Sequence, residues 1–316
     1  MKIACLTSGG DAPGMNAVIR AIVRAGNLYG HEIYGIRDGY KGLVEDDMIL
    51  LTHQSVSGFL SKGGTFLGTS RLPEFTQLKV REVAVQNLKQ RGIDALIVIG
   101  GDGTYKGGMD LAKMGVKVIG IPGTIDNDVA GTDFTIGFNT AVETIVDAID
   151  KLRDTSSSHQ RVSIIEVMGR QSGDLAVYAG ICGGAEFIIT PENQIDTEAM
   201  IETIKKYKDE GRRHAIVVVT EKILDPHELA HEITERSGFS SRATVLGYIQ
   251  RGGSPCPDDR ILGSRMGTYA IELLNDEIHG VCVGVRNNQM VHLEFAQVVN
   301  QKRAKSALYD LVKKVS

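Results

Sequence analysis

The sequence contains no tryptophan, and aromatic residues make up only 5% of it. Its net charge of −4 arises from acidic and basic residues spread along the chain, so no basic stripe points to a nucleic acid. The scarcity of aromatic rings also weakens any case for base stacking. No apolar run approaches the roughly 20 residues that cross a bilayer. These absences disfavour nucleic-acid and membrane partners.

Cysteine is scarce and dispersed. The four cysteines, Cys5, Cys182, Cys256 and Cys282, form no CxxC pair. We therefore expect reduced thiols in a cytoplasmic protein, with neither a disulfide framework nor a zinc site. The first apolar stretch is broken by glycine too soon to resemble a signal peptide, which agrees with a cytoplasmic location.

Glycine, by contrast, is abundant, with 37 residues that gather at the ends of apolar runs. Such positions are typical of tight strand-to-helix turns near ligands. The apolar runs are continuous rather than alternating, which predicts parallel strands buried on both faces. The expected strands cover residues 3–6, 32–36, 95–99, 118–121, 162–167, 187–190, 215–220, 244–247 and 281–285. The expected helices cover residues 13–30, 80–91, 105–114, 139–155, 174–183, 197–210 and 260–275.

This repeated alternation of strands and helices predicts an α/β fold of two doubly wound lobes, each with a mostly parallel sheet and helices on both faces. A length of 316 residues allows one large domain or two modest ones. Composition alone does not locate the boundary between the lobes. Asp11 is expected to cap the first helix, and Pro13 to occupy its first turn.

Two carboxylates follow the expected strand at 118–121, in residues 122–128, which read Pro-Gly-Thr-Ile-Asp-Asn-Asp. Loops at the carboxyl ends of parallel strands are where open α/β sheets bind ligands. Asp126 and Asp128 could therefore divide the work between accepting a proton and holding a metal ion. The alternative is an ordinary polar turn.

Glycine-rich loops follow two other expected strands. Residues 100–104 read Gly-Gly-Asp-Gly-Thr, which matches neither the Walker pattern nor GxGxxG. Asp102, flanked by glycines, could hold Mg²⁺ together with phosphate oxygens, or the loop could be only a turn with a helix cap. Residues 7–14 could offer bare backbone amides to a phosphate, or form only a tight turn. Together with residues 122–128, these loops suggest phosphoryl transfer from a magnesium nucleotide.

Arginines flank two further expected strands. Arg161 and Arg170 are nine residues apart, as are Arg242 and Arg251. Nine extended residues span roughly 30 Å, so the members of a pair cannot serve one small ligand unless a neighbouring subunit supplies one of them. The planar guanidinium suits phosphate, although single arginines are usually only surface residues. Glu221, at the end of the strand at 215–220, could accept a sugar hydroxyl or simply cap its strand.

Residues 7–20, 63–75, 100–104, 122–128, 154–161, 167–170 and 243–255 together resemble the signature stretches of bacterial ATP-dependent 6-phosphofructokinases, over essentially the whole chain. The resemblance implies transfer of a phosphoryl group from Mg-ATP to the 1-hydroxyl of fructose 6-phosphate, giving fructose 1,6-bisphosphate and ADP in glycolysis. It implies a homotetramer whose active sites are completed across a subunit interface. The implied nucleotide-binding lobe comprises residues 1–136 and 251–303, and the sugar-phosphate-binding lobe comprises residues 137–250 and 304–316.

The resemblance also assigns roles to individual residues. Asp126 would be the base on the sugar hydroxyl, supported by Thr124 and Asp128, and Arg170 would stabilise the transferring phosphoryl group. The residues implied for ATP are Gly10, Arg71, Leu72, Gly101, Asp102, Gly103 and Thr104, with Asp102 also holding Mg²⁺. The residues implied for the sugar phosphate are Thr124, Ile125, Asp126, Met168, Gly169, Arg170, Glu221, Tyr248 and Arg251, with Arg161 and Arg242 reaching in from a neighbouring subunit.

One sugar-phosphate position departs from the family pattern. Tyr248 stands where the family usually has a histidine, and a tyrosine supplies no cation near neutral pH. Charged hydrogen bonds contribute about 1.5–3 kcal/mol against about 1 kcal/mol for neutral ones, so we predict an affinity reduced by no more than about tenfold.

The resemblance further implies an effector site between subunits for ADP or phosphoenolpyruvate. Its matching residues are Arg20, Arg24, Arg153, Gly184, Ala185, Glu186, Arg212, Arg213 and His214. His53, Gly58 and Glu210 leave this site less positive than is usual in the family. We therefore expect weak or altered effector control.

Three other functions are to be weighed. Pyrophosphate-dependent relatives tend to carry bulkier or charged residues where this chain has Gly103 and Gly123, so the two glycines favour ATP. NAD kinase activity is supported only by the glycine loop at residues 100–104, and it does not explain Asp126, Asp128 or the four arginines. A catalytically silent, effector-sensing subunit is disfavoured because Asp102, Asp126 and Arg170 are all present.

Overall fold

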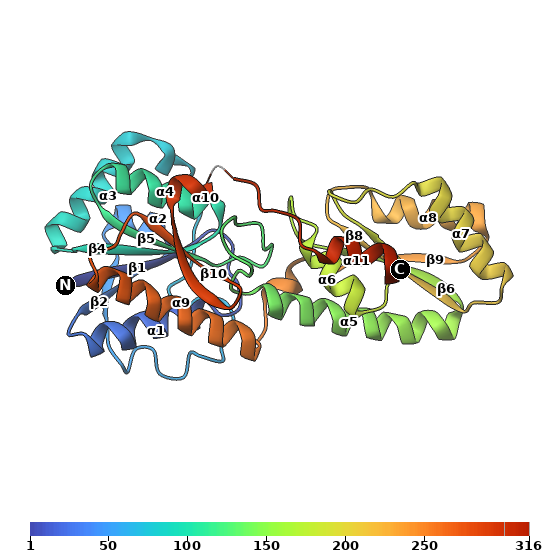
Figure 1. Ribbon diagram of the computed structural model, residues 1–316, viewed down its shortest axis with the longest axis horizontal. Helices are drawn as coiled ribbons and strands as arrows, with labels where there is room; N and C mark the ends of the chain where they lie inside the picture. The colour runs from blue at the N-terminus through green and yellow to red at the C-terminus, as the bar shows by residue number, and fades with distance from the viewer. Residues whose placement is uncertain (300, 316) are drawn as a thin grey trace. The chain divides into compact units, whose positions relative to one another are not determined.

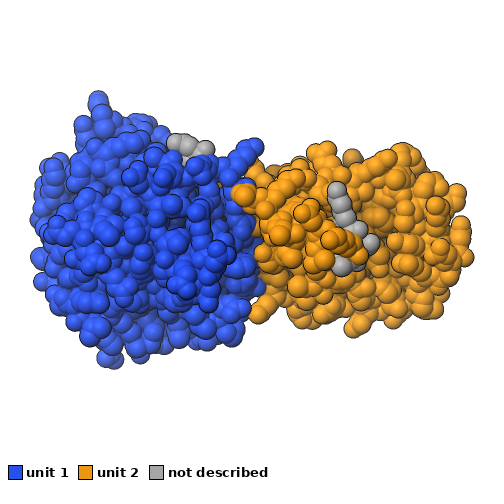
Figure 2. Space-filling view, in the orientation of Figure 1, with its two compact units in different colours: residues 1–140, 251–303 blue, residues 141–250, 304–316 orange. Residues whose placement is uncertain are grey.

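The computed structural model describes residues 1–299 and 301–315, which form two compact units (Figure 2). Unit 1 comprises Met1–Thr140 and Arg251–Arg303, and unit 2 comprises Ala141–Gln250 and the segment that begins at Ala304. In the part of the chain so described, no helix combines the length and apolarity needed to cross a membrane. Which ligand each unit binds stays a prediction.

Unit 1 is built on a seven-stranded sheet in the order β11-β10-β5-β4-β1-β2-β3. Neighbouring strands pair in parallel except for β3 and β11, which are antiparallel at the two edges. The central strands are almost wholly buried, as their continuous apolar runs predict. The bounds are β1 (Lys2–Ser8), β2 (Glu32–Ile36), β3 (Met48–Leu51), β4 (Ala95–Gly100), β5 (Lys117–Pro122), β10 (Val281–Arg286) and β11 (Gln289–Glu294).

Helices cover both faces of this sheet (Figure 1). On one face α1 (Met15–Leu28) packs against α9 (Pro257–Asn275). The other face holds a core formed by Phe75, Tyr105, Phe295 and many aliphatic side chains. The elements that bring this core together are α2 (Tyr40–Glu45), the 3₁₀ helix η1 (Pro73–Thr76), α3 (Leu78–Arg91), α4 (Asp102–Lys113) and α10 (Phe295–Val299).

Unit 2 has a smaller sheet of four parallel strands in the order β7-β8-β6-β9. Its strands are β6 (Arg161–Val167), β7 (Phe187–Ile189), β8 (His214–Thr220) and β9 (Ser241–Val245). A core on one face joins the sheet to α7 (Thr197–Asp209) and α8 (Pro226–Ser237). The remaining elements are α5 (Phe138–His159), α6 (Asp174–Cys182), η2 (Gly247–Arg251) and α11 (Leu308–Val315), which packs against α6.

The α/β fold with mostly parallel sheets and helices on both faces is confirmed. All nine expected strands are present, but the strand expected at 244–247 is shifted: β9 ends at Val245 because Gly247 begins η2. The predictions that Asp11 caps the first helix and that Pro13 lies in its first turn are both wrong. The helix begins at Met15, and its N-cap is Gly14 in a left-handed conformation, φ 109°, with no side-chain cap.

Candidate functional site

Three loops of unit 1 leave the same edge of its sheet. Ser8 lies opposite Gly100, and Gly100 lies opposite Pro122, so β1, β4 and β5 end in register. The chain runs from β1 to β2 and β3 on one side and then returns to β4 on the other. The gap between β1 and β4 is therefore the topological switch point, where open α/β sheets bind ligands. The three loops singled out in the sequence meet there.

Internal hydrogen bonds hold the glycine loop. The Thr104 hydroxyl, which is buried, donates to the Ser8 carbonyl oxygen at 2.9 Å, and the Tyr40 hydroxyl donates to the Thr104 carbonyl oxygen at 2.5 Å. The Gly123 N–H donates to the Gly100 carbonyl oxygen at 3.0 Å, which ties this loop to the next one. Gly101 precedes α4, so the first amides of that helix face the switch point without helical partners.

Asp102 stands in the first turn of α4 with a side chain that is 39% exposed. Its Oδ2 atom lies 3.2 Å from the Lys106 ammonium nitrogen, one turn along the helix. No group of three or more His, Cys, Asp or Glu residues suited to a metal occurs within residues 1–299 and 301–315. A single accessible carboxylate fits Mg²⁺, which takes one or two protein carboxylates and completes its shell with phosphate oxygens and water.

The loop that carries Asp126 is anchored by its neighbour Asn127. Asn127 is fully buried in a left-handed conformation, φ 51°, and its side-chain oxygen accepts the Thr135 N–H at 2.9 Å. Asp126 is only 7% exposed, and its N–H donates to the Thr124 hydroxyl at 3.2 Å. Asp128 is half-buried in the same loop. The Asp-Asn-Asp pattern revealed the two carboxylates, whereas the anchoring role of Asn127 was not predicted.

Other residues predicted for the phosphate donor also lie in unit 1. A Cβ atom added to Gly10 would come within 3.0 Å of the Arg251 guanidinium, so the glycine makes room for that side chain. Arg71 is exposed, and the adjacent Leu72 packs against the core around Phe75. Arg251, which was predicted to bind the 6-phosphate, also belongs to unit 1.

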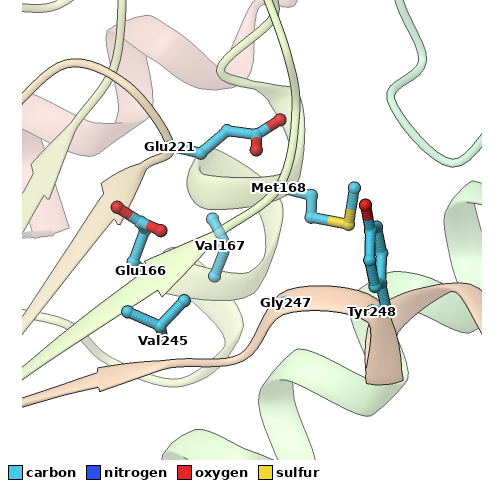
Figure 3. Close-up of a pocket in the computed structure, with 7 residues that line it drawn as sticks. All are labelled: Glu166, Val167, Met168, Glu221, Val245, Gly247 and Tyr248. Atoms are coloured by element: carbon cyan, nitrogen blue, oxygen red, sulfur yellow. The ribbon is translucent and has the colours of Figure 1, made fainter.

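Unit 2 has a cavity of about 180 Å³ at the carboxyl edge of its sheet (Figure 3). Val167 lies opposite Thr220 and Glu166 opposite Val245, so β6, β8 and β9 all end at this edge. Three residues predicted for the sugar phosphate line the cavity together: Met168 and Glu221 for the sugar, and Tyr248 for the 6-phosphate. The other lining residues, Glu166, Val167, Val245 and Gly247, were not predicted.

Two carboxylates and no cationic side chain line this cavity. Burial, followed by repulsion from Glu221 and then from Asp225, raises the pKa of Glu166, and His227 opposes that rise. Carboxylate oxygens accept hydrogen bonds from hydroxyl groups, whereas they repel a phosphate. The cavity therefore suits the neutral polyol part of a ligand.

A buried glutamine joins two walls of the cavity. The side chain of Gln250 is fully buried; its Oε1 accepts the Met168 N–H at 3.1 Å and its Nε2 donates to the Gly247 carbonyl oxygen at 2.9 Å. These bonds connect the end of β6 to η2. The sequence contained no signal for this role, because nothing in the pattern of residues 247–251 indicates that the glutamine turns inward.

Arg161 and Arg242 lie at the opposite, amino-terminal edge of the unit 2 sheet. Arg161 is the first residue of β6, and Arg242 pairs with Ser163 near the start of β9. A strand of seven residues spans about 20 Å, so these arginines do not reach the cavity of their own unit. The structure thus separates them from Met168, Glu221 and Tyr248.

The residues predicted for an effector are divided between the units. Arg20 and Arg24 lie on α1 in unit 1, where burial and then repulsion from Arg24 lower the pKa of Arg20. In unit 2, Arg153 donates to the Gly184 carbonyl oxygen at 2.9 Å and lies 3.0 Å from the His214 ring. The remaining residues of the set, Ala185, Glu186, Arg212 and Arg213, also belong to unit 2.

A protein-family model described as phosphofructokinase matches residues 2–274. This chain belongs to the phosphofructokinase family. A phosphofructokinase from Saccharomyces cerevisiae is 32% identical, with a TM-score of 0.87, over 99% of this chain and 46% of that one. A phosphofructokinase from Pichia pastoris in the T-state is 36% identical, with a TM-score of 0.87, over 94% of this chain and 35% of that one. The chain thus spans less than half the length of these two yeast phosphofructokinase chains.

The fold also occurs in pyrophosphate-dependent phosphofructokinases. The enzyme from Marinobacter aquaeolei superimposes with a TM-score of 0.86 over 98% of this chain and 86% of that one. At 21% identity this likeness shows the fold alone. Family membership therefore leaves the phosphate donor open.

Proposed function

We propose that this chain is an ATP-dependent 6-phosphofructokinase that transfers the γ-phosphoryl group of Mg-ATP to the 1-hydroxyl of fructose 6-phosphate. Besides family membership, the proposal is supported by the position of two loops. The glycine loop with Asp102 and the loop with Asp126 leave neighbouring strands in register at the switch point of unit 1. A phosphate held by the first loop would therefore be presented beside a carboxylate from the second.

In the proposed reaction Asp126 accepts the proton of the sugar 1-hydroxyl as that oxygen attacks the γ-phosphorus. The bond from the γ-phosphorus to the bridging oxygen breaks, and ADP leaves. Asn127 keeps the Asp126 loop in place through the hydrogen bond to Thr135. Thr124 and Asp128 support the phosphoryl group, and Arg170 stabilises its charge during transfer. Positioning and electrostatic stabilisation supply most of the catalysis of phosphoryl transfer.

Asp102 is the residue that would hold Mg²⁺, together with the phosphate oxygens of the nucleotide. Bound Mg²⁺ would neutralise negative charge on those phosphates. Lys106, whose ammonium nitrogen lies 3.2 Å from Asp102 Oδ2, is a further cation beside the proposed metal and phosphate site. Gly10, Arg71, Leu72, Gly101, Gly103 and Thr104 complete the proposed ATP site.

The contacts proposed for the sugar phosphate follow the family resemblance. Met168, Gly169 and Glu221 contact the sugar hydroxyls, whereas Arg251 and Tyr248 bind the 6-phosphate. Arg161 and Arg242 lie at the far edge of their sheet, which supports their assignment to the active site of a neighbouring subunit. A homotetramer would supply such a neighbour.

The donor is proposed to be ATP rather than pyrophosphate because of two glycines. A Cβ on Gly103 would meet no atom within 4 Å, so a larger side chain there would project into the open space before the loop. A Cβ on Gly123 would come within 3.0 Å of Met15 and 3.1 Å of Ile99. A larger residue at position 103 would obstruct the space that a nucleotide needs, whereas one at position 123 would have to displace the buried side chains of Met15 and Ile99.

Regulation by ADP or phosphoenolpyruvate is proposed to be weak. The effector residues on α1 and in unit 2 are present, but His53, Gly58 and Glu210 reduce the positive charge of the site. Arg212 also stacks on Tyr207, with its guanidinium carbon 3.9 Å from the ring centroid. That contact occupies one of the cations that would bind an anionic effector.

The experiment that tests the function is an initial-rate titration of fructose 6-phosphate with Mg-ATP and, separately, with Mg-pyrophosphate. We expect turnover with ATP and at least about 100-fold less with pyrophosphate, a ratio equal to about 2.7 kcal/mol in the activation free energy. Repeating the ATP titration with added ADP or phosphoenolpyruvate tests effector control. Faster turnover with pyrophosphate would overturn the donor assignment.

Asp126→Ser is the matched test of the base. The variant should lose about 10²–10⁴-fold in kcat, the usual contribution of a general base, while fructose 6-phosphate binding measured by calorimetry changes only a few-fold. Activity that survives within a few-fold would show that Asp126 is not the base.

A further inference from the structure

Arg170 has an unusual backbone conformation for a residue with a side chain. It lies beyond the end of β6 with φ 60°, in the left-handed region, directly after Gly169 with φ 140°. Arginine in this region costs on the order of 1 kcal/mol, so the surrounding structure must hold it there. Its side chain is exposed. The direction in which the guanidinium leaves the chain is thus set by this backbone conformation.

Glu221 supplies that support. Its Oε1 atom accepts the Arg170 N–H at 3.1 Å, and its own N–H donates to the Val167 carbonyl oxygen at 2.8 Å. Glu221 is therefore joined to both ends of the segment 167–170, through its side chain at Arg170 and through its backbone at Val167. A carboxylate that accepts a backbone N–H forms a charge-assisted bond, roughly twice as strong as a neutral one.

Glu221 also lines the cavity of unit 2, beside Met168 and across from Glu166 (Figure 3). The carboxylate that would meet a sugar hydroxyl is thus the same group that fixes the turn before Arg170. Gly169 has no room for a side chain, because a Cβ there would overlap the Ser172 carbonyl oxygen. The turn is therefore compact and has few alternative ways to present the arginine.

We infer that Glu221 is a positioning residue for Arg170 as well as a sugar contact, so that the loss of its acceptor oxygen misdirects the arginine that acts on the phosphoryl group. This inference rests on the proposed function for its kinetic consequences. It assigns to one side chain both recognition of the sugar and placement of the cation. Sugar binding, by ordering Glu221, would then also order Arg170.

The test compares Glu221→Gln with Glu221→Ala. Glutamine keeps a side-chain oxygen for the Arg170 N–H but loses the charge, so KM for fructose 6-phosphate should rise while kcat falls at most about threefold. Alanine removes the acceptor, and kcat should fall by about 10–100-fold, the scale expected when a reacting group is misplaced by about 1 Å. Equal kcat losses in the two variants would overturn the inference.

A double-mutant cycle with Arg170→Ala separates positioning from a direct effect. If Glu221 acts through the arginine, adding Glu221→Ala to Arg170→Ala should lower kcat little further. If Glu221→Ala lowers kcat by the same factor with and without Arg170, the two residues act independently and the inference fails. Should Glu221→Ala not fold, Glu221→Asp, whose carboxylate is one methylene shorter, replaces it in the cycle.

Hydrogen exchange tests the contact without any assay of activity. The amide of Arg170 should exchange slowly in the wild type and in Glu221→Gln, and faster in Glu221→Ala. Equal exchange in all three proteins would overturn the positioning role, whatever the reaction is. Conversely, the expected exchange pattern in a protein that fails to phosphorylate fructose 6-phosphate would refute the proposed function and leave the contact established.

Discussion

The two units differ in the chemical groups that they present at the carboxyl edges of their sheets. In unit 1 the groups that face the switch point are mainly backbone amides and short side chains, tied together by the bonds of Thr104 and Asn127. In unit 2 they are long side chains from separate strands, and Tyr248 is 77% exposed whereas Asp126 of unit 1 is 7% exposed. The unit 1 site is thus held by its own hydrogen bonds, whereas the unit 2 site includes an exposed side chain.

This difference predicts where substitutions do harm. A backbone-built site fails when a Cβ is added at a crowded glycine, because the loop cannot be formed. A site built from side chains tolerates substitution of an exposed residue and changes only its affinity. Each unit can therefore be probed with a substitution and a nearby control.

The largest effect is expected from Gly100→Ala in unit 1. The added Cβ would overlap the Ser8 carbonyl oxygen and the Thr104 hydroxyl, so the bond that holds the glycine loop would be lost. We expect a destabilisation of about 1–3 kcal/mol or more, together with loss of ATP binding. Thermal unfolding and calorimetric titration with Mg-ATP measure the two effects.

The control in the same loop is Gly103→Ala. Its Cβ would meet no atom within 4 Å, and the position lies in α4, where alanine is favoured over glycine by about 1 kcal/mol. The melting temperature should therefore be unchanged or higher, while ATP affinity falls. Equal melting temperatures for both variants would contradict the claim that the glycine loop fails when a Cβ is added at the crowded Gly100.

An intermediate effect is expected from Tyr248→His in unit 2. A histidine at this exposed position of the cavity can carry a positive charge toward the 6-phosphate, so KM for fructose 6-phosphate should fall by up to about tenfold. Ile249→His is the control, since Ile249 is 60% exposed but is not among the residues that line the cavity. An unchanged or higher KM for Tyr248→His would contradict the prediction.

The smallest effect is expected from Glu166→Gln. Because burial and the nearby Glu221 and Asp225 raise the pKa of Glu166 against the opposing effect of His227, the folded state holds this proton more tightly than the unfolded state. The stability that Glu166 contributes is therefore fully present at pH values below the ordinary pKa of a carboxyl group. It is lost as the pH rises through the raised pKa of Glu166. Glu166→Gln should then gain stability relative to the wild type as pH rises from 4 to 7, by no more than about 2 °C in Tm.

A suitable control for this pH comparison is Glu202→Gln on the exposed face of α7. Its melting temperature should follow that of the wild type throughout the pH range. If Glu166→Gln also follows the wild type, the two carboxylates of the cavity do not interact, and the cavity is more open to solvent than its lining suggests.

Much of the fold could be predicted because the central strands are buried on both faces. A run such as residues 95–99 is apolar throughout, and only a covered parallel strand explains it. The antiparallel edge strands β3 and β11 were missed. β11 is partly exposed, and its polar and apolar side chains do not form a continuous run. β3 is apolar throughout but only four residues long. Helix α8 was missed because its His and Glu residues weaken the apolar stripe, although Asp225 caps it.

Candidate site residues could be proposed from the sequence where the residue type itself indicates a chemical role. Asp102, Asp126 and the four arginines stand out because several charged residues follow or precede expected strands together, although each alone has an ordinary structural explanation. Glu166 was hidden, because it lies within β6 rather than after it, and only the register of β6 with β9 brings it to the cavity. Gln250 was hidden because an amide can face solvent or the core with equal ease.

The two anchors, Asn127 and Gln250, are both carboxamides, one in the loop of each candidate site. A carboxamide neither gains nor loses a proton over the range in which enzymes work. The hydrogen bonds that these two side chains make should therefore persist throughout that range. Neither anchor should then contribute a step to the pH profile of turnover.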